Sequence, residues 1–375
     1  MPVKALRRDG EPIEQGRVTR ILAFRGLERQ PAAAAEAGAI VAVAGLARAT
    51  VAAPLSDPAV TAPLPAQPID PATIAMTFSV NDGPFAGQDG SKVTSRQIGD
   101  RLRREAEGNV AIQVGESEQR DAFEVAGRGE LQLAVLIETM RREGFELCVG
   151  RPRVLFRVDP ATGGRLEPVE EVVIDVDAEH AGIVVEKLTA RRAALEDLRP
   201  AGAGKQRLVF RAPSRALIGY HGEFLTDTRG TGVLHRLFAA WEPFRGAIQP
   251  RHTGVLIASE LGEATAYALF NLEERGPLFI GPGERVYPGM IVGEHTRGND
   301  LEVNPLRQKK LTNIRAAGKD DHLLLTPPVP VTLERALAYL ADDELVEVTP
   351  KAIRLRKRHL DPHERRRQAR QRESA

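Results

Sequence analysis

The segment GRGELQLAVLIETMRREGFEL, residues 127–147, carries a clear helical pattern followed by a strand-like one. Four apolar side chains recur at i, i+3, i+4 and i+7, which is the spacing of one helix face: Leu133, Leu136, Ile137 and Met140. Gly144 ends this pattern, and β-prone residues 145–149 follow it. We therefore predict a helix that ends at Gly144 and leads into a strand.

The residues before this segment predict the rest of one folding unit. Thr94 and Gln97 have the spacing of a capping box, so we expect a helix that begins there and runs to about Glu107. Runs of β-prone residues predict three strands, at 73–80, 109–114 and 121–126. The order βαββαβ is that of a ferredoxin-like domain.

The same order recurs further along the chain. Apolar residues at helical spacing mark another helix face at Ala181, Val184, Val185 and Leu188. Strand-like runs occupy 169–176, 207–211 and 232–238, with a helix near 214–226. We predict a second ferredoxin-like unit here. Beyond about Pro250 short strands broken by Gly and Pro, as in residues 276–295, and a short helix at 332–340 indicate a mainly β region.

The N-terminal residues predict part of a small barrel. Residues 17–24 and 39–45 are β-rich, whereas residues 54–71 contain six prolines and favour a linker. The predicted fold class is therefore α+β, with these parts: a partial β-barrel (1–53), a Pro-rich linker (54–71), two ferredoxin-like βαββαβ domains (72–158 and 165–245), a mainly β C-terminal domain (250–360) and a basic tail (361–375).

Charge is distributed unevenly along the chain. The net charge is +1, but residues 351–375 carry ten Lys or Arg against three Asp or Glu, which makes +7 there and −6 elsewhere. Such a segment is either a solvated tail or a nucleic-acid contact. Its last part, HERRRQARQRESA, has no apolar face, so we expect residues 363–375 to be disordered until bound.

Composition also limits the class of protein. Cys148 is the only cysteine, so an intramolecular disulfide and a thiolate zinc cluster are excluded. No apolar run approaches the roughly 20 residues that cross a bilayer, and the first residues do not resemble a secretory signal. We expect a cytoplasmic protein with no membrane partner.

The sequence contains no complete motif for phosphate binding or catalysis. RPAGAGKQ, residues 199–206, has Arg199 and Gln206 where a phosphate loop needs Gly and a hydroxyl, and is interpreted as a hairpin loop. GRGELQ, residues 127–132, lacks the last glycine of a dinucleotide motif and predicts a tight strand-to-helix turn. Neither an HExxH motif nor a nucleophile elbow occurs, and the i, i+4 pair His359 and His363 lies in a strongly basic segment that disfavours a metal. We therefore predict no catalytic residue, metal or cofactor in this chain.

Several segments resemble the TypA/BipA family of translational GTPases. Residues 127–147 look like the third domain of elongation factor G and its relatives, and residues 76–102 and 210–235 are similar to TypA/BipA rather than to elongation factor G or LepA. Residues 262–321 resemble the C-terminal domain particular to this family. The resemblance covers residues 16–360 and begins midway through the family's second domain. It implies that the GTPase domain, with its GTP and Mg²⁺, is not in this sequence.

Residues 302–322, EVNPLRQKKLTNIRAAGKDDH, contain five Lys or Arg and predict a long polar loop. Composition alone favours a solvated loop. The family resemblance instead implies that this loop reaches the peptidyl-transferase region of the large ribosomal subunit and touches the acceptor end of A-site tRNA. The residues to which it gives these contacts are Lys309, Lys310, Asn313, Arg315 and Lys319.

A second candidate contact is IRLRKRHL, residues 353–360, where apolar and basic residues alternate. A strand there would bury one side and present cations to rRNA on the other. The alternating cations are Arg354, Arg356 and Arg358, and Lys357 is a further candidate contact in this segment. Further exposed arginines that could bind rRNA are Arg101, Arg103 and Arg104.

The leading hypothesis is thus a monomeric ribosome-binding portion of a TypA/BipA protein, which binds large-subunit rRNA and A-site tRNA. It would act in large-subunit assembly and stress-adapted translation, with GTP hydrolysis supplied by another domain. One alternative is that the full gene product is a GTPase of which this chain is the C-terminal portion. Another is a stand-alone interaction protein that binds tRNA or assembly factors without ribosomes.

Overall fold

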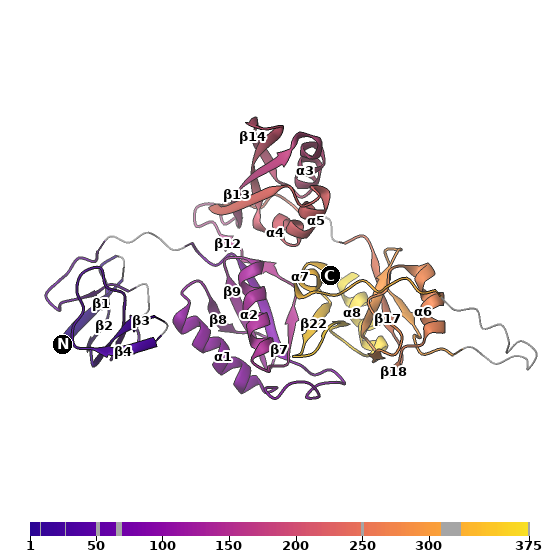
Figure 1. Cartoon of the computed structure of the whole chain (residues 1–375), viewed down its shortest axis with the longest axis horizontal. Helices are drawn as coiled ribbons and strands as arrows, with labels where there is room; N and C mark the ends of the chain where they lie inside the picture. The colour runs from indigo at the N-terminus through magenta and orange to yellow at the C-terminus, as the bar shows by residue number, and fades with distance from the viewer. Residues whose placement is uncertain are drawn as a thin grey trace, which may run out of the picture. The chain divides into compact units, whose positions relative to one another are not determined.

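The structure of the chain is a computed structural model (Figure 1). It describes these residues: 1–7, 9–26, 28–49, 53–64, 70–248, 251–308 and 324–373. The chain divides into two compact units, one of residues 1–71 with 102–113 and the other of residues 72–101 with 114–375. Among the described residues, no helix combines the length and the apolar character needed to cross a membrane.

Two three-stranded antiparallel sheets form from the N-terminal residues. Their strand orders are β2-β1-β6 and β4-β3-β5. The strands are β1 (Pro2–Leu6), β2 (Pro12–Arg17), β3 (Arg20–Arg25), β4 (Glu28–Ala32), β5 (Val41–Ala44) and β6 (Leu55–Ser56). The two sheets stay separate, so the described residues contain no closed barrel. The predicted strand over residues 17–24 is interrupted, because β2 ends at Arg17 and β3 begins at Arg20.

The proline-rich segment begins with an edge strand rather than with a free linker. Leu55 of β6 lies opposite Ala5 of β1. The amide of Leu6 donates to the carbonyl of Pro54 at 3.0 Å. A proline keeps its carbonyl but has no amide hydrogen, so this segment can accept bonds at a sheet edge and cannot form a central strand.

A seven-stranded sheet contains the first predicted ferredoxin-like unit. Its path is β23-β22-β10-β7-β9-β8, with β11 also paired to β7. The strands are β7 (Ile74–Val80), β8 (Gln113–Glu116), β9 (Ala122–Gly127), β10 (Leu147–Gly150), β11 (Arg153–Val154), β22 (Glu344–Val348) and β23 (Ile353–Lys357). In chain order β7, β8, β9 and β10 alternate with two helices as βαββαβ, the order that the sequence predicted.

The two helices of this unit are α1 (Ser95–Gly108) and α2 (Glu130–Arg142). The capping box is confirmed: the amide of Gln97 donates to Thr94 Oγ1 at 3.3 Å, and the amide of Thr94 donates to Gln97 Oε1 at 3.2 Å. The predicted apolar face of α2 is confirmed as well, since all four of its residues are buried: Leu133, Leu136, Ile137 and Met140.

Ion pairs on α2 should make the stability of the protein depend on pH. Arg141 Nε lies 2.7 Å and Arg142 Nε 2.8 Å from the Glu138 carboxylate. The hydrogen bond from Arg141 holds the pKa of Glu138 at about 2, although burial opposes this shift and Arg142 adds to it. Because the folded pKa is below the unfolded one, the stabilisation is present above about pH 4.5 and is lost as pH falls towards 2.

We expect the free energy of unfolding to fall by about 1 kcal/mol more in the unmodified chain than in Glu138→Gln between pH 5 and pH 3.5, since the pair is partly solvated. Urea unfolding at the two pH values measures the difference. Glu118→Gln, which changes an exposed residue of the same type, is the matched control. Equal pH dependence in Glu138→Gln and the unmodified chain would contradict the assignment.

A five-stranded sheet forms the second predicted unit. Its path is β12-β13-β15-β14, and β16 pairs with the other edge of β13. The elements are β12 (Arg157–Val158), β13 (Arg165–Asp177), α3 (Ala178–Ala190), β14 (Ala194–Gly202), β15 (Lys205–Pro213), α4 (Ser214–Leu217), α5 (Tyr220–Asp227) and β16 (Val233–Pro243). The core includes Leu188, Phe210 and Phe224.

Two details of this unit differ from the prediction. β14 is a strand that the sequence did not predict, because Leu195 and Leu198 are its only large apolar residues and the strand ends in Pro200, Ala201 and Gly202. The helix predicted near residues 214–226 is divided into α4 and α5, since Gly219 between them has a φ of 72° and cannot continue a right-handed helix.

The C-terminal residues form a small sheet and also complete the larger one. β17 (Gly254–Ala258) lies between β20 (Ile291–His295) and β21 (Leu301–Val303). The remaining elements are β18 (Gly262–Glu263), α6 (Ala266–Leu272), the 3-10 helix η1 (Glu273–Arg275), β19 (Arg285–Val286), α7 (Leu333–Tyr339) and α8 (Pro362–Glu373). β22 pairs with β10, so the chain after Glu344 returns to the sheet of the first ferredoxin-like unit.

Candidate nucleic-acid interface

The predicted loop residues lie outside the described part of the chain: Lys309, Lys310, Asn313, Arg315 and Lys319. The described residues on both sides of this loop are held by one short helical segment. Thr265, the N-cap of α6, donates through Oγ1 to the carbonyl of Arg307 at 2.7 Å. Glu273, the first residue of η1, accepts through Oε1 from the amide of Thr326 at 2.7 Å. Arg307 and Thr326, which flank the loop, are therefore both hydrogen-bonded to the segment formed by α6 and η1.

Further contacts fix the base of this loop. Asn304 donates to Glu260 at 2.7 Å, and its Oδ1 accepts from the amide of Leu306 at 2.9 Å. On the other side the amide of Val329 donates to the carbonyl of Leu278 at 2.8 Å. A long polar loop on a rigid base is a common way to present binding residues. The sequence did not single out Thr265 or Glu273, because their partners are about 40 to 50 residues away.

Of the four cations predicted for residues 353–360, two do not have the expected exposed position. Arg356 and Lys357 are only 1% and 2% exposed, so they do not form an open basic edge. The edge is covered because Met290 bridges to Arg356 and the amide of Lys357 donates to the carbonyl of Gly289 at 2.8 Å. The alternation of apolar and basic residues predicted an exposed cationic face, which is absent from the described strand β23 because both of its faces are packed.

Arg356, on the edge strand β23, belongs to a largely buried polar cluster that also includes residues of β10 and β22. Its Nη2 contacts Asp82 and lies 3.4 Å from Cys148 Sγ. Burial raises the pKa of the Cys148 thiol to about 11, although the Arg356 charge opposes that shift. For Arg356 burial alone would lower the pKa, but the neighbouring Cys148 and Asp82 raise it above its ordinary value. The guanidinium therefore stays charged.

Glu347 on β22 completes this cluster. It is fully buried and accepts hydrogen bonds from Tyr287 Oη at 2.5 Å and from Arg354 Nη1 at 2.8 Å. Burial and the nearby Glu347 carboxylate raise the pKa of Tyr287 well above its ordinary value, so the phenol remains a donor. Arg354 also lies 3.6 Å from Asp89 and keeps 18% of its side chain exposed.

A second cluster surrounds Lys357. Its Nζ lies 2.6 Å from Asp300, 3.0 Å from Asp343 and 3.0 Å from the fully buried Glu344. Glu344 also accepts from Arg251 Nη2 at 2.9 Å. Burial alone would lower the pKa of Lys357, but these carboxylates raise it. The cluster joins the start of the C-terminal region to β22 and β23.

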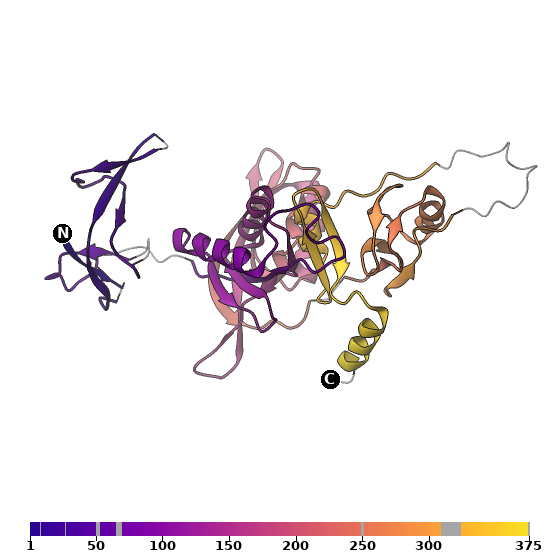
Figure 2. The same ribbon diagram turned by 90° about the horizontal axis from the view of Figure 1, so that it is seen from below.

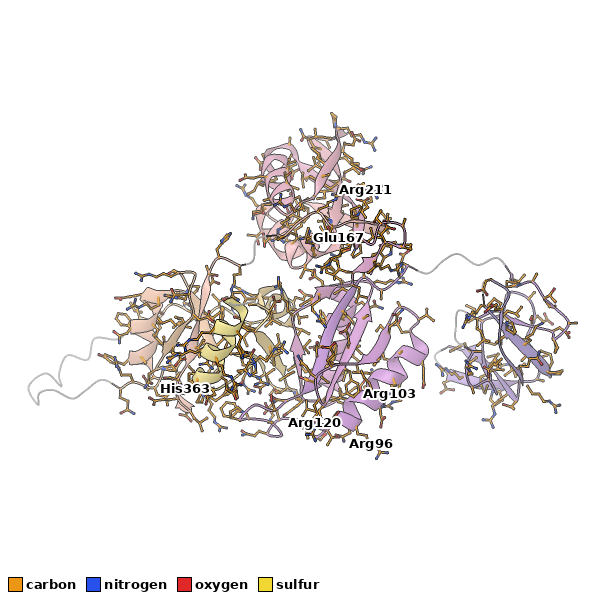
Figure 3. The ribbon with its side chains drawn as sticks, turned by 180° about the vertical axis from the view of Figure 1, so that it is seen from behind. Arg96, Arg103, Arg120, Glu167, Arg211 and His363 are labelled. Carbon is orange, nitrogen blue, oxygen red and sulfur yellow. The ribbon has the colours of Figure 1, made fainter. Side chains whose placement is uncertain are left out.

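The remaining predicted cations differ in their exposure and in their partners. Arg358 is half-buried, its amide donates to the carbonyl of Asp343 at 2.8 Å, and its guanidinium donates to the carbonyl of Asp342 at 3.4 Å. Arg101 pairs with Glu143 at 2.8 Å and is 13% exposed. Arg103 and Arg104 have exposed side chains on α1, and Figure 3 shows the position of Arg103.

Both glycine-rich motifs have the predicted structural roles. β9 ends at Gly127 and α2 begins at Glu130, and Gln132 closes the turn by accepting from the amide of Arg128 at 2.9 Å. β14 and β15 form a hairpin whose turn places Ala203 and Gly204 at φ values of 50° and 77°. Among the described residues, no group of three or more His, Cys, Asp or Glu could hold a metal ion.

The tail does not match its prediction. Residues 362–373 form the helix α8, although this segment has no apolar face. The helix begins because Asp361 Oδ1 accepts from the amides of His363 and Glu364 at 2.5 and 3.3 Å. The sequence contained this N-cap, but the lack of an apolar face led us to expect disorder.

Comparison with known proteins first defines a class. The family model for the elongation factor G C-terminus matches residues 164–252, which contain the second βαββαβ unit. The fold and this match place the chain among the proteins related to elongation factor G. The model for the TypA/BipA C-terminal domain then matches residues 253–362, which include the loop base and β23. The chain belongs to the TypA/BipA family.

Curated relatives are similar over almost the whole chain. The large ribosomal subunit assembly factor BipA of Salmonella typhimurium is 49% identical over 352 residues, which are 94% of this chain and 58% of the relative. Its Escherichia coli K12 counterpart is 50% identical with the same coverage. The protein of that name from Haemophilus influenzae is 47% identical over 367 residues, 98% of this chain and 59% of the relative. The chain thus spans less than two thirds of these relatives.

Proposed function

We propose that this chain is the ribosome-binding part of a TypA/BipA translational GTPase and acts in large ribosomal subunit assembly and stress-adapted translation. The observation that carries the proposal is the 47–50% identity, over 94–98% of the chain, to proteins named large ribosomal subunit assembly factor. The proposal places a single copy of the chain in the cytoplasm. It assigns no GTP or Mg²⁺ site to the residues of this sequence.

The proposed contacts are with large-subunit rRNA and the acceptor end of an A-site tRNA. Lysine and arginine suit phosphate contacts, and an asparagine suits a base edge or a 2′-hydroxyl. The loop residues proposed for these roles are Lys309, Lys310, Asn313, Arg315 and Lys319. The hydrogen bonds that hold Arg307 and Thr326 support this role, because they fix where the loop leaves the fold.

The cations of β23 divide between two proposed roles. Arg356 and Lys357 hold the strand in place, since they are buried against carboxylates. Arg354 of β23 and Arg358, the residue after the strand, keep part of their surface exposed, so they are the proposed rRNA contacts of this segment. Hydrogen bonds to Glu347 and Asp342 hold these two side chains in place.

Sedimentation through a sucrose cushion tests the proposal. The purified chain is mixed with large subunits, with small subunits or with tRNA alone, at about 0.1 M and about 0.5 M salt. We expect it to sediment with large subunits and to lose much of that binding at the higher salt, because phosphate contacts release counterions. Tight binding to free tRNA without binding to subunits would favour the stand-alone interaction protein, and binding to neither would overturn the proposal.

A further inference from the structure

The helix α8 has one side that holds it to the protein and another that is strongly basic. On the first side, Arg365 is only 14% exposed. Its Nη1 donates to the carbonyls of His359 and Leu360 at 2.9 and 2.6 Å, and its Nη2 lies 3.0 Å from Glu302. These contacts, together with the Asp361 cap, fix the first turn of the helix. Figure 2 shows α8 projecting beyond the strands that precede it.

The other side of α8 is a cationic surface. Its residues fall at i, i+3, i+4, i+7 and i+8, which is one helix face: His363, Arg366, Arg367, Arg370 and Gln371 (Figure 3 labels His363). Three of them, Arg366, Arg367 and Arg370, are exposed. Within the described residues no ion pair is formed by these three arginines, so their charge is not compensated there.

The chemistry of this face limits what it can bind. Residues 362–373 contain none of Phe, Tyr, Trp, Leu, Ile, Val or Met, and His363 is their one aromatic ring. A membrane-surface helix needs an apolar face, and a single-stranded nucleic acid is bound by stacking of successive bases on several aromatic rings, whereas this face has one imidazole. Guanidinium groups suit phosphate oxygens, which they bind as a fork. A phosphate backbone without exposed bases therefore fits best.

We propose that the face of α8 formed by Arg366, Arg367 and Arg370 docks on the phosphate backbone of double-stranded RNA, independently of base sequence. The helix spaces its first and last arginine by roughly 6 Å along its axis. Arg365 positions this face but does not take part in it. The inference rests on the proposed function in that the duplex would be part of rRNA. It adds a contact separate from the loop and from Arg354 and Arg358.

The test measures binding of the full chain to an RNA duplex of about 20 base pairs by fluorescence anisotropy at several salt concentrations. We expect Arg366→Gln/Arg367→Gln/Arg370→Gln to bind roughly tenfold more weakly at about 0.1 M salt. The salt slope, which is the slope of the logarithm of the binding constant against the logarithm of the salt concentration, should decrease in magnitude by up to about three. Glutamine keeps a good helix former at each position. Replacing the same three arginines by lysine should retain most of the binding.

A matched control removes three exposed arginines elsewhere, Arg229, Arg297 and Arg335, by the same change to glutamine. This control has the same net charge, so it should keep the duplex affinity and slope if the α8 cluster is the site. Equal losses in the two variants would overturn the inference. Tighter binding to phosphatidylserine-containing vesicles than to the duplex would also overturn it.

The two proposals can fail separately. If the α8 variant loses duplex binding while the unmodified chain does not sediment with large subunits, the proposed function is wrong and the RNA-binding face stands. If the chain sediments with large subunits but the α8 variant keeps its duplex affinity and salt slope, the inference about α8 is wrong and the proposed function stands.

Discussion

Replacing Glu344 by alanine is expected to lower the free energy of unfolding by about 3–5 kcal/mol, because it leaves buried cations without their carboxylate. Glu344 is fully buried and accepts from both Arg251 and Lys357. Lys357 would keep Asp300 and Asp343 as partners, whereas Arg251 would lose its ion pair with Glu344 and retain the carbonyls of Thr253 and Tyr339 and its contact with the Tyr339 ring. The loss therefore falls mainly on Arg251, and urea unfolding at pH 7 measures it.

Two further variants make this result interpretable. Glu118→Ala removes an exposed carboxylate and should change the free energy of unfolding by less than about 0.5 kcal/mol. Glu344→Gln keeps an acceptor but loses the charge, so it should fall between the other two. A loss below about 1 kcal/mol in Glu344→Ala would mean that the cluster does not hold β22 and β23 in the sheet.

The second large effect is expected at the loop. Lys309→Ala/Lys310→Ala/Arg315→Ala should weaken binding to large ribosomal subunits by about tenfold or more, and should lower the salt slope by up to about three. The reason is that each lost cation removes one phosphate contact and the counterions released by it. Equilibrium sedimentation with large subunits at several salt concentrations measures both quantities.

The control for the loop removes the same number of positive charges elsewhere, by changing Arg229, Arg297 and Arg335 to alanine. All three side chains are exposed, so folding should be little affected. If the loop variant and this control bind large subunits with the same affinity and slope as the unmodified chain, the loop is not the contact.

Local patterns predicted the elements whose stability depends on near neighbours. The apolar face of α2 and the capping box at Thr94 both lie within a few helical turns, and the structure has them as predicted. The turn at Gly127 and the hairpin at Gly204 are equally local, since each follows from the few residues around it. For such elements, spacing and turn chemistry are sufficient.

Long-range pairing was not predictable in the same way. β22 pairs with β10, so Val346 lies opposite Val149 although nearly 200 residues separate them. The sequence offers short β-rich runs that could pair in many ways, and nothing in the residues of β22 selects β10. The buried carboxylates of Glu344 and Glu347 contradict the usual preference of acids for the surface, and only their partners explain them.

In the candidate site, too, local features were predictable and long-range contacts were not. The basic composition of residues 353–360 was visible, but the burial of Arg356 depends on residues 289–290, which cover the strand edge. In α8 the Asp361 cap was present in the sequence, while the contact of Arg365 with Glu302 was not. Charge patterns thus indicated which segments are basic, and the fold determined which cations are accessible.

Site-specific cross-linking from the loop to ribosomal RNA tests the central claim most directly. Cys148 is buried and is the only native cysteine, so Lys310→Cys introduces one reactive thiol that can carry a photo-activated cross-linker. Arg229→Cys, at an exposed position outside the loop, is the control. We predict that Lys310→Cys cross-links to large-subunit rRNA at sites that the control does not reach. Cross-links only to small-subunit rRNA, or none from a chain that still sediments with large subunits, would contradict the account.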